Sequence, residues 1–197
     1  MTRKDIIKIK ETLSVLIGEP LRELDRSGPM LIFNFGELVE VDDLKIGDDK
    51  KPIIDDDGRG VPIKSLVGKY ALDALCSMRF TCGNEVIFAK SDIFLPTEEQ
   101  FHKEGFVWDT FDWHTYGNTI FDELVSKHFK GEFSKYIVKN VKIDKFGDLT
   151  ITFDNNFTLE FFADGSEYSE NWRFGESDNS DSLIVTSKGI IDESMQI

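Results

Sequence analysis

LDALCSMRFTC, residues 72–82, decides how this chain folds. Its odd positions carry the polar residues Asp73, Ser77, Arg79 and Thr81, whereas every even position is apolar or small. Because successive side chains of a strand point to opposite faces, this alternation predicts a half-buried strand over 72–82. Both cysteines of the chain, Cys76 and Cys82, are expected on its buried side.

Gly83-Asn84 follows directly and is typical of a two-residue hairpin turn. The turn predicts an antiparallel partner strand that continues to about residue 89. In that register the pairs are Phe80 with Ile87, Met78 with Ala89, and Arg79 with Phe88.

A second hairpin is predicted in GDLTITFDNNFTLEFF, residues 147–162. A three-residue loop at 154–156 aligns apolar residues on both strands, whereas a two-residue turn sets them against polar ones. The predicted pairs are Phe153 with Phe157, Ile151 with Leu159, and Leu149 with Phe161. The loop needs a positive φ near its end, which asparagine tolerates.

Apolar spacing elsewhere completes the fold class. Steps of three and four predict amphipathic helices over 3–17 and 119–130. Further strands are expected over 30–35, with Gly36 as a turn, and over 137–144, while the Asp- and Gly-rich segment 42–64 is expected to be a mobile surface loop. The sequence therefore predicts a single α+β domain with a mostly antiparallel sheet and about two amphipathic helices.

Two stretches of the chain resemble each other. Residues 70–93 and 157–190 each carry a leucine-acidic pair, then an apolar-Arg-Phe triplet, then a β-branched strand. We infer two similar β units, about 21–96 and 134–191, although a short gapped match also arises by chance. Arg79 and Arg173, the latter preceded by Trp172, would stand at equivalent places, either as structural clamps to carboxylates or as anion-binding groups.

The charge narrows the choice of partners. The formal net charge is −14 and no basic patch interrupts it, which argues against nucleic acid and membrane surfaces as partners. A basic protein partner is compatible with this field, as is solubility alone. The chain contains two cysteines with no Cys-x-x-Cys pair and no apolar run long enough to span a bilayer, so we expect a cytoplasmic protein.

The stretch WDTFDWHTYGN, residues 108–118, gathers the candidate binding residues. Packing of this loop over the sheet is the favoured interpretation, a protein contact surface the second, and a divalent cation site a weaker third. No phosphate-binding loop, nucleophile elbow or zinc motif occurs, so we expect no cofactor and favour a protein that is not an enzyme. The candidates are Trp108, Asp109, Asp112, Trp113, His114 and Tyr116.

The run GDLTITFDNNFTLEFF followed by SEYSENWRF, in the last third, resembles small acidic α+β proteins of bacteria that are uncharacterised or assigned as immunity proteins of polymorphic toxin systems. The resemblance implies a non-enzymatic binder whose acidic face covers the active site of a basic toxin. The alternative is an enzyme or small-ligand binder with an anion site between the two β units, anchored by Arg79 or Arg173.

Overall fold

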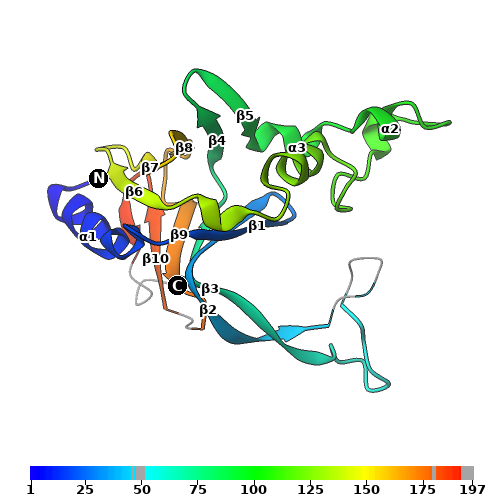
Figure 1. Cartoon of the computed structure of the whole chain (residues 1–197), viewed down its shortest axis with the longest axis horizontal. Coiled ribbons are helices and arrows are strands. Elements are labelled where there is room, and N and C mark those ends of the chain that lie inside the picture. Colours follow the sequence, from blue (N-terminus) through cyan, green and yellow to red (C-terminus); the bar gives the residue numbers. More distant parts are fainter. Residues whose placement is uncertain (46, 48–51, 179–180, 192–197) are drawn as a thin grey trace.

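Two antiparallel sheets form the protein (Figure 1), as the sequence predicted for an α+β fold. The structure is a computed structural model that describes residues 1–197 except 46, 48–51, 179–180 and 192–197. One sheet has six strands in the order β1-β2-β3-β9-β10-β11 and the other has five in the order β5-β4-β8-β7-β6. The strands are β1 Leu21–Ser27, β2 Met30–Leu44, β3 Pro62–Ala74, β4 Ser77–Cys82, β5 Glu85–Ala89, β6 Val138–Ile143, β7 Leu149–Phe153, β8 Phe157–Phe162, β9 Glu170–Glu176, β10 Ser182–Thr186 and β11 Gly189–Ile191.

The two predicted amphipathic helices are present as α1 (Arg3–Leu13) and α3 (Ile120–Phe129). A capping box between Thr2 and Asp5 starts α1, which continues into a 3₁₀ turn and packs its buried side against β6. The α3 helix covers part of the five-stranded sheet at β5 (Figure 1). A short third helix, α2 (Glu98–Phe101), lies outside both sheets.

The chain crosses from one sheet to the other twice, and this corrects the prediction of one strand over 72–82. The segment forms β3 in the six-stranded sheet and β4 in the five-stranded sheet, with a corner at Leu75-Cys76. Both corner N–H groups donate to the carbonyl of Asn171, at 2.8 and 2.9 Å. The predicted alternation still holds across the corner, but only Cys76 is buried, and Cys82 is half-exposed.

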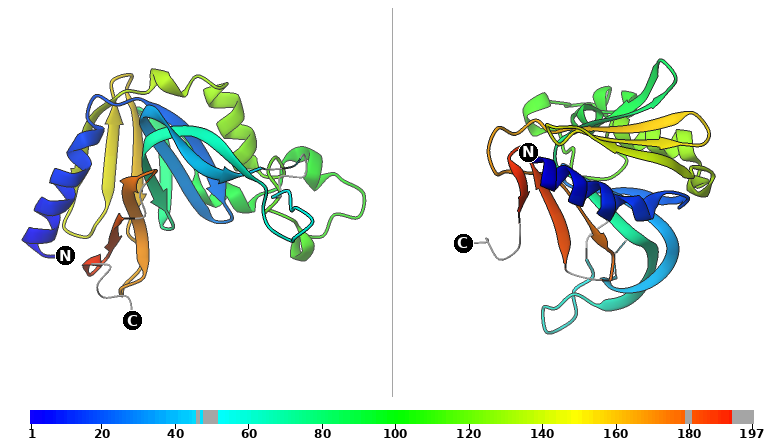
Figure 2. Two further views of the ribbon diagram at one scale, coloured as in Figure 1. Left: turned by 90° about the horizontal axis from the view of Figure 1, so that it is seen from below. Right: turned by 90° about the vertical axis from the view of Figure 1, so that its left-hand side faces the viewer.

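Among the described residues, the buried apolar side chains of both sheets form one hydrophobic cluster, the core of the protein. Figure 2 shows the arrangement of the two sheets from two further sides. Phe33 of β2 and Phe161 of β8 meet edge to face within this cluster, with ring centroids 5.4 Å apart. Trp172 is its largest fully buried side chain, and its indole N–H donates to the carbonyl of Gly147 at 3.0 Å. The same core takes in the buried side of α3, which fixes the helix against the five-stranded sheet.

The two predicted hairpins had different outcomes. The β7–β8 register is confirmed, with Ile151 opposite Leu159, Leu149 opposite Phe161, and Asn156 at a φ of 66°. The β4–β5 register is wrong beyond the turn, because a bulge between Phe80 and Thr81 shifts the pairing by one residue. Phe88 therefore lies opposite Phe80 and is fully buried in the core, whereas Ile87 is only partly buried and packs against it.

The expected turn at Gly36 is corrected, and the expected loop over 42–64 is corrected at both ends, because β2 continues to Leu44 and β3 begins at Pro62. Gly36 adopts a φ of 89° inside β2, where a bulge between Phe35 and Leu38 lets the strand continue to Leu44. The partner strand β3 begins at Pro62, so β2 and β3 form a long ribbon that projects from the sheets (Figure 1). Of the predicted loop, residues 46 and 48–51 lie outside the described residues.

Candidate functional site

Residues 97–118 form an arm that reaches out from the end of the molecule near α3 (Figure 1). Its base is closed by backbone hydrogen bonds from Thr97 N to Asn118 O and from Ile120 N to Leu95 O, both 2.9 Å. Helix α2 lies within the arm, where Thr97 caps its first turn. The arm is therefore a long loop with defined local structure, which leaves the five-stranded sheet and returns to the start of α3.

Four aromatic rings of the arm pack against one another and remain outside the main core. Phe106 lies at their centre, with ring centroids 5.4 to 6.0 Å from those of Phe101, Trp108 and Phe111. Phe101 and Trp108 are nevertheless 45% and 55% exposed. We call these four residues the aromatic cluster. Trp113, by contrast, stacks edge to face on Phe94 and packs against the core.

One acidic residue of 108–118, Asp112, organises the loop. The Asp112 carboxylate accepts the backbone N–H groups of His114 and Thr115 and the Thr115 hydroxyl. The Thr115 hydroxyl bond is the main reason that the pKa of Asp112 lies below its ordinary value. His114 stacks on Trp113, with centroids 3.7 Å apart, while Asp109 is exposed. Across the described residues, no group of three or more His, Cys, Asp or Glu side chains converges to hold a metal ion.

A buried ion pair that the sequence analysis missed anchors the arm. Arg26 of β1 forks onto Asp122 of α3 with bonds of 2.7 and 2.8 Å, and both side chains are nearly inaccessible to solvent. The same guanidinium donates to the Thr115 carbonyl, and Asp122 accepts the Gly117 N–H and the Thr119 hydroxyl. The pair thus joins the six-stranded sheet, the end of the arm and the start of α3.

The electrostatics of Asp122 follow from these bonds. Burial alone would raise the pKa of its carboxyl group, but the hydrogen bonds from Arg26, Thr119 and Gly117 outweigh burial and hold the pKa below its ordinary value. The spacing Thr119-x-x-Asp122 is a sequence signal for a helix cap. Nothing in the sequence marks the arginine 96 positions earlier as its partner.

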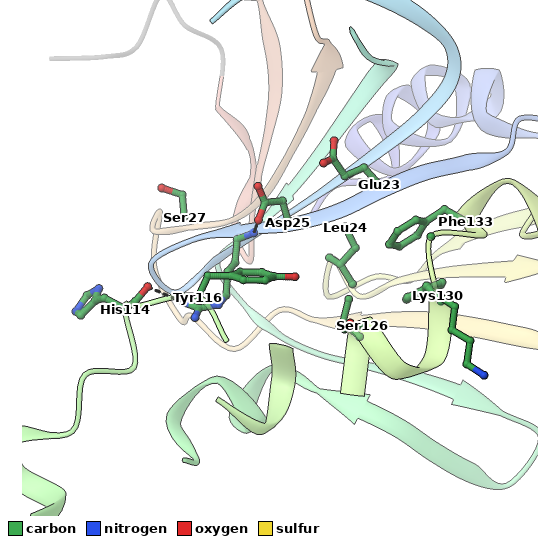
Figure 3. Close-up of a pocket in the computed structure, with 13 residues that line it drawn as sticks. Glu23, Leu24, Asp25, Ser27, His114, Tyr116, Ser126, Lys130 and Phe133 are labelled. Atoms are coloured by element: carbon green, nitrogen blue, oxygen red, sulfur yellow. Dashed lines mark hydrogen bonds between the residues drawn. The ribbon is translucent and has the colours of Figure 1, made fainter. Parts of the chain in front are cut away.

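Beside this ion pair lies a groove of about 750 Å³. Figure 3 shows β1 on one side and the last turn of α3, with Ser126 and Lys130, on the other. Tyr116 and His114 lie at one end of the groove. We call this feature the β1 groove; its walls are Glu23–Ser27, His114, Tyr116, Val125, Ser126, Phe129–Gly131 and Phe133.

The two arginines singled out from the sequence each fork onto a carboxylate of the chain. Arg79 binds Glu160 at 2.7 and 3.1 Å and lies over the Phe162 ring. Arg173 binds Glu170 at 2.6 and 3.0 Å. Because both guanidinium groups already bind a carboxylate of the chain, a structural role for these arginines is favoured over an anion-binding site. Trp172 is fully buried and presents no surface to a partner.

The candidate residues therefore do not form one site. Trp108, Asp109, Asp112, Trp113, His114 and Tyr116 belong to the arm, whereas Arg79, Trp172 and Arg173 lie in the sheets. None of the described helices is both long enough and apolar enough to cross a membrane. Searches of family models, curated proteins and solved structures found no match to this chain.

Proposed function

We propose that this chain is a non-enzymatic protein-binding protein whose arm contacts a basic protein partner. One observation carries the proposal: the aromatic cluster lies outside the core and exposes Phe101 and Trp108, yet the arm that holds it is anchored by the buried pair of Arg26 and Asp122. Aromatic residues supply much of the binding energy at protein interfaces. An anchored arm also loses little conformational freedom when it binds.

Charge supports a basic partner. Residues 97–118 contain five acidic residues against a single lysine, in a chain whose net charge is −14. Acidic groups around an apolar contact speed encounter with a basic protein and discourage acidic ones. A cytoplasmic location belongs to the same proposal, since the two cysteines, Cys76 and Cys82, are both free thiols.

In its specific form, the proposal is that the chain is an immunity-type inhibitor that covers the active site of a basic toxin. The acidic and aromatic character of the arm suits this task. If so, a neighbouring gene encodes a toxin-like basic protein, and that protein loses its activity when mixed with this chain. A neighbourhood without such a gene, and no inhibition of any basic enzyme that binds, would contradict the inhibitor role.

Affinity measurements test the binding role itself. The immobilised protein is exposed to extract of its native host, retained basic proteins are identified, and each is purified for calorimetry. Trp108→Ala should weaken binding by about tenfold or more, as truncation of an aromatic hot spot does. Val86→Ala is the matched control, because Val86 is equally exposed at 54% but lies on β5. Equal affinity of Trp108→Ala and Val86→Ala would exclude the arm as the contact surface.

A further inference from the structure

The β1 groove runs along the backbone edge of a strand. Five consecutive residues, Glu23 to Ser27, line it. Because successive side chains of a strand point to opposite faces, five in a row can border one groove only where it follows the strand's edge. β1 is the end strand of its sheet and pairs with β2 on one side only. Every second residue of β1 therefore turns its N–H and C=O away from β2. The N–H of Arg26 already donates to the Asp25 carboxylate at 2.7 Å, so an added strand would displace that bond.

The same edge is already paired just before the groove begins. Gly18 N donates to Val138 O, Val138 N to Glu19 O, and Leu21 N to Tyr136 O, at 2.8 to 2.9 Å. Pro20 and Ile137 form an antiparallel bridge within this pairing. The pairing stops at Tyr136, where the chain enters the 3₁₀ turn Phe133–Lys135. An added strand would continue along the edge from the point where this segment leaves it.

The walls of the groove give the chemistry of its occupant. Leu24, Val125 and Phe129 are buried core residues whose edges form an apolar floor. Glu23 and Asp25 add two carboxylates, and neither forms a salt bridge with a lysine or arginine side chain among the residues that the structure describes, although Asp25 accepts the backbone N–H of Arg26. Partial desolvation, together with the nearby carboxylates of Asp25 and Asp43, raises the pKa of Glu23.

The cations of the groove do not cancel these carboxylates. Arg26 is committed to Asp122 by two hydrogen bonds. Lys130 lies on the opposite wall, at the end of α3. The carboxyl end of a helix itself favours a positive charge nearby. The unpaired charge at the strand edge is therefore acidic and suits a lysine or arginine side chain of a ligand.

We propose that the β1 groove binds an extended segment of a basic protein by strand addition to β1. The segment lays apolar side chains on Leu24, Val125 and Phe129, and directs a lysine or arginine toward Glu23 and Asp25. The edge of five residues is about 17 Å long, which matches a strand of that length. This inference rests on the proposed protein-binding role and adds to it a second contact, apart from the aromatic cluster, at the groove that His114 and Tyr116 of the arm help to line.

A peptide titration followed by NMR tests the proposal. The probe is a capped eight-residue peptide of alternating valine and lysine, added to the isotope-labelled full chain. Saturable amide shifts are expected in 23–27 and 125–131. A valine and glutamate peptide of equal length should produce none. N-methylation of alternate residues of the probe should weaken binding about tenfold, because strand addition depends on backbone hydrogen bonds.

Two matched variants locate the contact. Ser126 is exposed and lines the groove, whereas its neighbour Lys127 is exposed and does not. Ser126→Tyr should therefore fill the groove and abolish the shifts, and Lys127→Tyr should retain them. Equal binding of the N-methylated probe, shifts outside the groove, or no binding would overturn the proposal. So would a concentration-dependent dimer that Ser126→Tyr dissolves, since the occupant would then be a second copy of this chain.

The variants also separate this inference from the function on which it rests. Once a basic partner is identified as described above, Trp108→Ala and Ser126→Tyr are compared in the same binding assay. Both should weaken the complex if arm and groove act together. If only Trp108→Ala does so, the protein-binding role stands and strand addition fails. If neither does so, both fail.

Discussion

Arg79 of β4 and Glu160 of β8 lie directly opposite each other in the five-stranded sheet, joined by a two-bond fork. In the six-stranded sheet Arg173 of β9 lies opposite Asp73 of β3. Each apolar-Arg-Phe triplet thus faces the leucine-acidic pair of the other stretch. The similarity between the two stretches has a physical counterpart: both chain segments cross between sheets and pair with each other on either side of the crossing.

Charge reversal tests the pair. Arg79→Glu places two carboxylates opposite each other on neighbouring strands, so the melting temperature should fall. Combining it with Glu160→Arg restores opposite charges and should recover most of the loss. Calorimetric melting of the wild type, both single variants and the double variant gives the coupling. A double variant whose loss equals the sum of the single losses would mean that the two residues do not interact.

Removing Asp122 should be far more damaging than removing an exposed acid. Asp122→Ala leaves the buried Arg26 guanidinium without its carboxylate, which costs about 3–5 kcal/mol of unfolding free energy in comparable buried pairs. Urea denaturation measures the loss. The control is Asp25→Ala, which removes an exposed carboxylate next to Arg26 on β1 and should change stability little. Equal losses would mean that the ion pair does not anchor the arm.

The same carboxylate predicts how stability depends on pH. The pKa of Asp122 in the folded chain lies below its ordinary value of 3.8. Its contribution is therefore complete above that ordinary value and disappears as the pH falls through the folded pKa. The urea midpoint of the wild type should drop more steeply between pH 5 and pH 2 than that of Asp122→Asn, because asparagine has no carboxyl group to titrate. Parallel pH profiles would contradict the assignment.

Hairpins with simple ladders were predictable from sequence, and bulged ones were not. The β7–β8 register followed from alternation on both strands and from an asparagine able to take a positive φ at 156. The bulge at Phe80-Thr81 has no local sequence mark, whereas the one after Phe35 is marked by Gly36, which the sequence analysis interpreted as a turn. The corner at Leu75-Cys76 was missed for a similar reason, since apolar alternation continues through it while the hydrogen-bonding partner changes.

The candidate site, too, was predictable from the sequence only in part. The aromatic content of 108–118 was visible in the sequence, but exposure depends on what lies nearby in space. Phe101 and Phe106, outside the predicted stretch, complete the aromatic cluster. The anchor joins Arg26 to a residue 96 positions later, and only its local half, the cap at Thr119, leaves a sequence signal. The β1 groove likewise depends on α3 returning to the edge of β1.

Thiol reactivity should distinguish the two cysteines. Burial raises the pKa of Cys76 to about 12, so this thiol stays protonated and shielded at pH 8, whereas Cys82 is half-exposed. One thiol per chain should react rapidly with Ellman's reagent in the native protein, and the second only on unfolding. Cys82→Ser should abolish the rapid phase. Two rapid thiols would place Cys76 outside the core.

Substitution by phenylalanine should destabilise the protein at Trp172 and change its stability little at Trp108. Trp172→Phe leaves the buried Gly147 carbonyl without its donor, which costs about 1–3 kcal/mol, and also removes part of a packed ring. Trp108→Phe changes an exposed residue outside the core and should alter the unfolding free energy by no more than about 0.5 kcal/mol. Urea denaturation measures both changes.

Acrylamide quenching gives an independent check on the two tryptophans. The fluorescence component lost in Trp108→Phe should be readily quenched, and the component lost in Trp172→Phe should be protected, because the indole of Trp172 is fully buried. A large destabilisation by Trp108→Phe would show that the aromatic cluster belongs to the folding core. The arm would then have a structural reason for its rings, and the proposal that they contact a partner would lose its main support.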